Sequence, residues 1–533
     1  MKQTLKKHAN IICIIVLGLL PLFSLLVNKI INPVSPSLLT SEWNDELFYF
    51  KQVEAIIHYG FPLGYYGFNE SHALSLSFAA WSPVLVWPWV ILGKIFGWTM
   101  KSVFVYNLLI YILALVLFGV FVKPSVKQTA VISLWYPAFF LNVRYIYSCM
   151  PEVICFAHMI IYWGLVLGYF KDRKKGYLYT SIVLGSLMTF MRPYLILFLV
   201  FSLMILFFGA QKGKRLVKGI VAFMILGITA FIYYLLNHYL SAEYLMPFFY
   251  TDFITTFFTD GFGPGVHNLF GTLYYKGRDF IQFMKDAFYI DRAAGIFFCI
   301  FVFKMVLETV QSIFEYRVAK KSALTDVAPK TAAKPILTGG FYSRLYMLFA
   351  DFAFLMALLL MYKLTEGSKH LLTFIMAGVL VMIMEEKRGW IYGIIMSVCV
   401  IYFGAFHCTD NFYDFGIPRV TDESEARYTY WQQAFEEGIE LDLSDVPSYK
   451  NAIIWEFADE VDGIQNITDW QMLYALPVGT GISCCWEYTD ENFDSIQCRY
   501  ISAPTGGDIE NMCIDAGYIC VGRDDRLCVY ARY

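Results

Sequence analysis

Charged residues are scarce in this chain of 533 residues: 16% are Asp, Glu, Lys or Arg, whereas soluble domains average about 25%. This scarcity excludes an ordinary soluble protein, since 58% of the residues are hydrophobic and apolar runs recur through the first 405 residues. The C-terminal tail has no glycine-rich nucleotide-binding motif, and no His and Cys cluster has metal-ligand spacing. No internal repeat is present, which counts against a transporter built from related halves. The composition instead predicts a polytopic α-helical membrane protein.

The C-terminal quarter of the chain differs in composition from the rest. Residues 406–533 carry 24 Asp and Glu against 7 Lys and Arg, whereas residues 1–405 carry 20 against 34. Seven of the 12 cysteines lie at or after Cys408, and such a domain suits an oxidising, extracytoplasmic compartment; reduced structural cysteines are the alternative. We therefore expect a transmembrane catalytic domain over 1–405 and a small α/β extracytoplasmic domain over 406–533.

The apolar runs predict about eleven spans with the N-terminus inside, because Lys2, Lys6 and Lys7 precede the first run. The same rule places the later basic clusters inside, at 123–127, 171–175, 212–218, 317–321 and 385–388. The short spans on either side of Arg192 then form a hairpin with this residue at its outer tip, where irregular backbone normally lines a cavity. The expected spans are 10–32, 102–122, 128–147, 152–170, 177–190, 193–209, 216–238, 293–313, 345–364, 371–384 and 390–405.

The segment 78–97 decides whether this orientation is consistent. It is long enough to span, but a crossing there would place the clusters at 123–127 and 171–175 outside. We therefore expect an interfacial helix in the first outer loop, with a spanning helix as the alternative. Two prolines and four tryptophans in and next to the segment suit the headgroup level: Trp81, Trp87, Trp89 and Trp98.

Ionisable residues from five separate segments are expected at the outer membrane level, where charges are costly unless they have a function. Cations there could hold the phosphate of a lipid, and a carboxylate could take the proton from an acceptor hydroxyl. Since phosphate leaves readily, a single base would suffice for direct displacement with inversion. The residues are Glu42, Asp45, Glu46, Arg144, Glu152, Arg192, Glu366, Lys369 and His370.

The acidic candidates have structural alternatives. Asp45 and Glu46 could cap the helix that begins there. Glu152 follows Pro151 at a helix start, where an acidic side chain favours the helix dipole.

The basic candidates also have structural alternatives. Arg144 and Arg192 could extend toward lipid headgroups, and Lys369 and His370 could simply be solvated in a tight turn. Inside the eighth span, Lys304 and Glu308 at i,i+4 are expected to form a structural pair rather than a site.

The order of elements resembles a known superfamily. One span leads to a long outer loop with Asp45-Glu46-Leu47-Phe48-Tyr49, which is followed by a proline-containing interfacial helix that ends in Phe96-Gly97. This resembles the GT-C integral-membrane glycosyltransferases, which include protein O-mannosyltransferases and the aminoarabinose transferases of lipid A. The resemblance covers the membrane part and the idea of a C-terminal outer domain.

The resemblance implies a polyprenyl-phosphate-linked sugar as donor and Asp45 as general base, with Glu46 beside it. Arg144 and Glu152 match an Arg and an acidic residue around the third span, although the family often has Asp at the second of these positions. Lys369-His370 stands where the family often has Arg-Tyr, which keeps one cation for the donor phosphate together with Arg192. Some members of the family use a divalent metal and others do not, so a metal near Glu152 is left open.

The sequence thus predicts a glycosyltransferase in the cell membrane, which acts on a glycan, lipid or protein acceptor at the outer face. The acceptor and membrane lipid are the expected partners, and nucleic acid is not. The alternative is a transporter or flippase of a lipid-linked glycan, which would need the cations but no base at Asp45. A weaker third possibility is a non-catalytic scaffold that presents the acidic tail.

Overall fold

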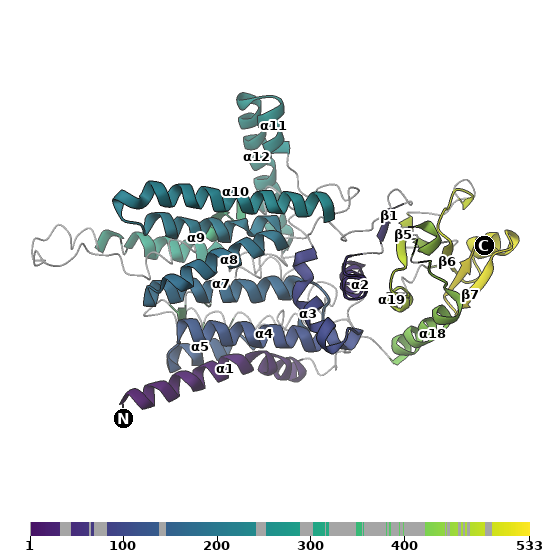
Figure 1. Cartoon of the computed structure of the whole chain (residues 1–533), viewed down its shortest axis with the longest axis horizontal. Helices are drawn as coiled ribbons and strands as arrows, with labels where there is room; N and C mark the ends of the chain where they lie inside the picture. Colours follow the sequence, from purple (N-terminus) through teal and green to yellow (C-terminus); the bar gives the residue numbers. More distant parts are fainter. Residues whose placement is uncertain are drawn as a thin grey trace, which may run out of the picture.

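Long apolar helices form a bundle, and a small mixed sheet with its own helices lies beyond one end of this bundle (Figure 1). The structure is a computed structural model of the whole chain. It describes residues 2–31, 44–62, 65–68, 83–137, 145–240, 252–287, 302–314, 316–318, 348–353, 355–356, 380, 383–384, 394, 398, 422–442, 444, 448–456, 460–461, 464–465, 470–485 and 493–532.

Four helices in the described residues are long and apolar enough to cross a membrane: His8–Val27, Met100–Val122, Glu152–Asp172 and Arg215–Leu236. Pro83–Phe96 and Pro193–Phe208 are shorter apolar segments. The helices of the bundle are α1 (Lys2–Ile31), α4 (Met100–Val122), α5 (Val126–Trp135), α7 (Glu152–Asp172), α8 (Lys175–Met191), η2 (Pro193–Leu195), α9 (Ile196–Phe208), η3 (Lys212–Lys214) and α10 (Arg215–Leu240).

Local sequence sets several of these boundaries. Thr99 caps α4 because its side chain accepts a hydrogen bond from the Ser102 amide at 3.2 Å, and Ser125 caps α5 in the same way through Gln128. Pro193 restricts Arg192 to extended backbone, which ends α8 and begins η2. The Arg192-Pro193 dipeptide therefore causes the break in the helix at the expected hairpin tip.

The helices α1 and α4 pack closely and run antiparallel. A Cβ atom at Gly18 would lie 2.7 Å from Val116, and one at Gly119 would lie 3.2 Å from both Ile14 and Leu17. Glycines therefore let these two apolar helices approach each other. Because the helices are antiparallel, α1 ends and α4 begins at the same end of the bundle (Figure 1).

Two short helices follow α1 and precede α4 in the sequence, and both lie at this end of the bundle (Figure 1). They are α2 (Asn44–Tyr59) and α3 (Trp87–Phe96), with η1 (Pro83–Val86) before α3. The chain therefore enters and leaves this region on one side, which is the arrangement expected if 78–97 lies at the interface. The position of this segment in a membrane stays a prediction.

Three of the expected cytoplasmic basic clusters lie together at the opposite end. Lys123, after α4, forms an ion pair of 3.1 Å with Asp172, at the end of α7. Lys171 donates to the Val122 carbonyl at 2.8 Å, and a Cβ at Gly209 would lie 3.7 Å from the Tyr169 hydroxyl. The bundle thus has a cationic end and, away from it, the end that carries α2.

The expected spans agree with the structure only where it describes them. The spans at 10–32, 102–122, 152–170 and 216–238 coincide with the four long apolar helices, and those at 177–190 and 193–209 coincide with α8 and with η2 and α9. The helix expected at 128–147 is shorter, since α5 ends at Trp135. The total of eleven stays a prediction, because the expected spans 293–313, 345–364, 371–384 and 390–405 lie partly or almost wholly outside the described residues.

The sheet has the strand order β1-β5-β2-β6-β8-β7. Strands β1, β5, β2 and β6 are parallel, whereas β8 is antiparallel to both β6 and β7. Strand β1 comes from the first loop, far from the other five in sequence, so the sheet draws on both parts of the chain. The strands are β1 (Tyr65–Phe68), β2 (Ala452–Glu456), β5 (Gly481–Cys485), β6 (Tyr500–Pro504), β7 (Ile519–Arg523) and β8 (Leu527–Ala531), beside the small pair β3 (Glu460–Val461) and β4 (Ile464–Gln465).

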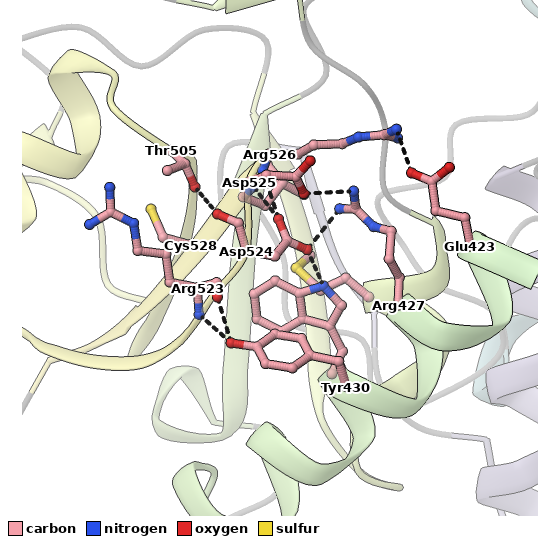
Figure 2. Close-up of polar contacts among 12 residues, drawn as sticks. Glu423, Arg427, Tyr430, Thr505, Arg523, Asp524, Asp525, Arg526 and Cys528 are labelled. Carbon is pink, nitrogen blue, oxygen red and sulfur yellow. Dashed lines mark hydrogen bonds and ion pairs between the residues drawn. The ribbon is translucent and has the colours of Figure 1, made fainter.

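The helices of the tail are α18 (Asp422–Gly438), η4 (Tyr449–Asn451), α19 (Trp470–Ala475) and α21 (Asp508–Asp515). Helix α18, strand β2 and the closing hairpin of β7 and β8 give the tail the mixed α/β structure that the sequence predicts. The hairpin turn binds α18 through Arg427, which forms an ion pair of 2.8 Å with Asp524, and through Tyr430, whose hydroxyl donates to the Arg523 carbonyl at 2.5 Å (Figure 2). The division of the chain at residue 406 stays a prediction.

The described cysteines of the tail are free thiols: Cys485, Cys498, Cys513, Cys520 and Cys528. Burial raises the pKa of Cys513 to about 12, and it also raises the pKa of Cys528. These two thiols pack in the apolar core between the sheet and α21. Four of the five described thiols are buried and act as small core residues, as in the alternative considered above, whereas Cys520 is exposed.

The close packing of α8 on α9 gives a test of the bundle. A Cβ at Gly185 would lie 2.8 Å from the backbone of Leu199, whereas a Cβ at Gly227 in α10 would meet no atom within 4 Å. Gly185→Val should therefore push α8 and α9 apart and lower the melting temperature of the detergent-purified protein by several degrees, the usual result of overpacking that costs about 1–3 kcal/mol. Gly227→Val, with the same change in helix propensity, should melt with the wild type; equal melting of all three proteins would contradict this packing.

Candidate functional site

The Asp-Glu-x-x-Tyr segment forms the first turns of α2, and Glu46 anchors it to the bundle. The Glu46 side chain is buried, with Oε1 accepting from the Ser148 hydroxyl at 2.6 Å and Oε2 accepting from the Cys149 amide at 3.1 Å. The Ser148 hydroxyl in turn accepts from the Met150 amide at 3.0 Å. These bonds lead to the turn before α7, so Glu46 connects two elements instead of serving only as a cap for its own helix.

Buried hydrogen bonds to a carboxylate are strong, and each contributes about 1.5–3 kcal/mol. They also affect the thiol in the turn, because burial and the nearby Glu46 raise the pKa of Cys149 well above its usual value. Cys149 is therefore held as a neutral thiol and is a poor nucleophile at neutral pH. The turn holds the start of α2 in a fixed position.

Asp45 is the second residue of α2, and its side chain lies outside the described part of the structure. Its backbone shares a helical turn with Glu46, so the bonds of Glu46 fix where that backbone lies. Arg144, Lys369 and His370, the other expected phosphate ligands except Arg192, lie outside the described residues, as do Glu42 and Glu366.

Arg192 and Glu152 form a buried ion pair. The Arg192 Nη2 and Glu152 Oε1 atoms are 2.8 Å apart, and both side chains are almost wholly buried. Arg192 Nη1 donates to the Tyr194 hydroxyl at 3.2 Å. Glu152 begins α7 and Arg192 follows α8, so the pair joins the start of one helix to the end of the next.

The ion pair lies close to α2. The hydroxyl of Tyr49, one turn after Glu46, is within electrostatic range of Arg192, and the same is true of Cys155 in α7. The structure therefore brings Glu46, Glu152 and Arg192 into one region around the start of α7. Within this region the charge of Arg192 is balanced by Glu152, which the sequence did not indicate.

Asn107 of α4 holds the chain that leads into this region. Its side-chain amide nitrogen donates to the carbonyls of Ser148 at 2.8 Å and Ile146 at 3.1 Å, while its oxygen accepts from the Trp89 indole at 2.7 Å. Sequence reasoning missed Asn107 and Ser148. A lone buried amide within an apolar span was the available signal for Asn107, because such groups need several partners.

The opposite side of α2 is held by the C-terminal domain. Lys51 Nζ donates to the Leu476 carbonyl at 2.6 Å and lies 3.0 Å from Glu54 Oε2, and the Tyr59 hydroxyl donates to the Val478 carbonyl at 3.0 Å. The rings of Phe50 and Tyr474 pack edge to face with centroids 5.3 Å apart. Helix α2 is thus fixed between the bundle and the tail (Figure 1).

Two further polar groups, at Lys304 and at His158, have no direct part in this region. Lys304 forms buried ion pairs with Glu308 and with Asp351, as expected for a structural cluster. His158 Nδ1 is 2.7 Å from the Ile154 carbonyl, one turn back along its own helix. Among the residues that the structure describes, no three His, Cys, Asp or Glu side chains are grouped so that they could hold a metal ion.

No family model matches this chain, and no curated protein does. Two solved structures are similar in shape: crystal structures of ArnT from Cupriavidus metallidurans, one in the apo state and one bound to undecaprenyl phosphate. Each match covers 96% of this chain and 97% of the other, with 12% identity and a TM-score of 0.41. A similarity of this degree carries no weight for the site or its chemistry.

The buried ion pair gives a quantitative test. Arg192→Met should lower the free energy of unfolding by about 3–5 kcal/mol, because Glu152 would keep a buried charge without its partner. Adding Glu152→Gln should recover part of this loss, so the two changes should be non-additive. Steric trapping in bicelles can measure these energies.

The exposed pair of Lys123 and Asp172 is the matched control, since it joins two helix ends at the cationic end of the bundle. Lys123→Met should cost about 0–1 kcal/mol. Equal losses in Lys123→Met and Arg192→Met would show that Arg192 is not in a buried pair.

The contact of Lys51 with the tail gives a second test. Lys51→Met should loosen α2, because it removes a buried charge-assisted bond worth about 1.5–3 kcal/mol. Amide hydrogen exchange of α2 should then be about tenfold faster or more. Lys101→Met, which removes the exposed ion pair with Glu425, is the control and should leave α2 unchanged; unchanged exchange in both variants would mean that the tail does not hold α2.

Proposed function

We propose that this chain is a membrane glycosyltransferase, which moves a sugar from a polyprenyl-phosphate donor to a cell-envelope acceptor at the outer membrane face. The observation that carries the proposal is the double anchoring of α2, by Glu46 on one side and by Lys51 and Tyr59 on the other. Such rigid placement of a helix whose first turn carries Asp45 is what positioning of a general base requires.

Asp45 is the proposed base. Both carboxylate oxygens of Glu46 already accept hydrogen bonds from the turn before α7, so the proposed role of Glu46 is to position α2. In the proposed reaction the acceptor hydroxyl attacks the anomeric carbon while its proton passes to the Asp45 carboxylate. The bond between the anomeric carbon and the phosphate oxygen breaks, and polyprenyl phosphate leaves with both electrons of that bond. A single displacement of this kind inverts the anomeric centre.

Arg192 is the proposed ligand of the donor phosphate among the described residues. Its ion pair with Glu152 uses Nη2, and a planar guanidinium has several N–H donors in fixed directions. Glu152 would hold the guanidinium in place before the donor arrives. Arg144, Lys369 and His370 are proposed to add positive charge around the same phosphate, and a divalent metal near Glu152 is compatible with this arrangement.

The proposed side of the membrane follows from charge. The end with the basic clusters is assigned to the cytoplasm by the positive-inside rule, which places α2 and the acidic tail outside. The tail, which contacts α2 directly, is proposed to help present a glycan, lipid or protein acceptor.

Substitution of the proposed base tests the mechanism. Asp45→Asn should lower the rate of sugar transfer by at least about 10³-fold, because the amide cannot accept the proton. This loss lies within the usual contribution of general base catalysis to a reaction rate. Binding of the donor and the melting temperature should stay close to wild type. The assay uses the purified protein in nanodiscs with a radiolabelled polyprenyl-phosphate sugar and a membrane extract as acceptor.

Asp172→Asn is the matched control, because it is the same change at the cationic end of the bundle, and it should transfer sugar at the wild-type rate. Sugar transfer at the wild-type rate by Asp45→Asn would contradict the proposed mechanism. Movement of the intact lipid-linked sugar across the bilayer by both variants, without transfer by the wild type, would favour the flippase.

A further inference from the structure

A helical hairpin projects sideways from the bundle after α10. It consists of α11 (Asp252–Thr259) and α12 (Phe262–Ala287), and its long axis crosses the direction of the bundle helices (Figure 1). In a membrane protein whose bundle lies along the bilayer normal, such a hairpin runs along the membrane plane.

The hairpin is held together by its own contacts. Gly261 has a φ of 94°, a left-handed conformation that allows the tight turn between the helices. A Cβ at Gly265 would lie 2.4 Å from the ring of Phe257, so this glycine lets α12 approach α11 closely. The Asn268 side-chain amide donates to the Thr256 hydroxyl at 2.8 Å. The two helices therefore pack against each other, and their outer faces are available for a contact with something else.

The outer faces are rich in large apolar side chains. Phe258 is 85% exposed and Phe262 is 79% exposed, at the end where the two helices meet. Along α12, Phe270, Tyr274 and Ile281 are also exposed and recur at helical spacing on one face. Exposed apolar patches of this kind in a folded chain mark a contact surface.

The charged groups on this hairpin favour a lipid interface over either bulk water or the bilayer centre. His267 and Arg278 lie on the same exposed face as Phe270 and Tyr274, and Arg278 lies over the ring of Tyr275, 5.5 Å from its centroid. The 26 residues of α12 are enough to cross a bilayer, but the helix is not apolar enough to do so. Aromatic rings interleaved with cations are typical of the headgroup level.

The remaining ionisable side chains described on the hairpin are Asp252, Asp260, Lys276 and Asp279, so the acidic and basic groups nearly balance. Binding would therefore depend on apolar insertion more than on attraction to anionic lipid.

The surface also continues one that already suits lipid. Helix α10, which leads into the hairpin, is one of the four long apolar helices, and only 6% of its apolar window is buried inside the protein. Its exposed side chains include Phe223, Phe231 and Tyr234. A lipid-facing helix that turns into a lateral, aromatic hairpin makes lipid the natural occupant of both surfaces.

We propose that α11 and α12 lie in the headgroup layer of the leaflet at the α2 end of the bundle, with Phe258, Phe270 and Tyr274 inserted toward the acyl chains. The hairpin then acts as a lateral brace that fixes the depth and tilt of the bundle. This inference does not depend on the proposed transferase activity.

Photo-crosslinking of the native full-length protein in nanodiscs tests the proposal. One lipid probe carries a diazirine near the headgroup, a second carries it at the end of the acyl chain, and labelled peptides are mapped by mass spectrometry. The headgroup probe should label peptides from 252–281, and the chain-end probe should label peptides from 215–236. Peptides from 493–532 set the background, and labelling of the hairpin at that background would overturn the proposal.

A variant sharpens the test. Phe258→Ser with Phe270→Ser and Tyr274→Ser should reduce labelling of the hairpin about tenfold, because each change removes a large inserted side chain. The control, Ile514→Ser with Ile519→Ser, removes exposed apolar side chains of the tail and should leave hairpin labelling unchanged. The proposal would be wrong if the lipid probes left the hairpin unlabelled and a protein cross-linker joined it to a second copy of the chain. Protein, and not lipid, would then cover this face.

Discussion

A buried carboxylate must find hydrogen-bond donors, and the way Glu46 meets this need organises the end of the bundle that carries α2. Its two oxygens bind the Ser148 hydroxyl and the Cys149 amide, so the first turn of α2 is fixed on the turn before α7. Asn107 holds the same turn from α4. The position of α2, and with it the backbone of Asp45, thus depends on polar bonds that are sheltered from water and cannot be exchanged for solvent without cost.

The second buried interaction, between Glu152 and Arg192, serves a different purpose. It joins the start of α7 to the end of α8, and it holds a buried guanidinium within electrostatic range of Tyr49. Desolvation makes such a pair a poor source of stability, and a preorganised cation is what the proposed binding of a donor phosphate would use. Helix α2 is also tied to the C-terminal domain through Lys51, and strand β1 joins the sheet of that domain. The helical bundle and the tail therefore both hold α2 in place.

The sequence predicted the parts of this arrangement that depend on composition and local chemistry. Apolar runs predicted the long helices, and the two short runs on either side of Arg192 predicted the break after α8. Contacts between segments far apart in sequence were not predictable. The bond between Lys51 and Leu476 joins residues 425 positions apart. Neither the hydrogen bonds of Glu46 nor the pairing of β1 with the sheet produces a periodic pattern in the sequence. The roles of Arg144, Lys369 and His370 stay predictions from the sequence alone.

The central claim is that the outer end of the bundle, around α2 and Arg192, receives a lipid-linked sugar. An electron cryomicroscopy map of the full chain in nanodiscs, with a non-hydrolysable polyprenyl-phosphonate sugar added in excess, tests it most directly. The account predicts density for the phosphonate beside the Arg192 guanidinium and for the sugar next to the first turn of α2. Density for the headgroup at the cationic end of the bundle, or on the lipid-facing side of α10, would contradict the account.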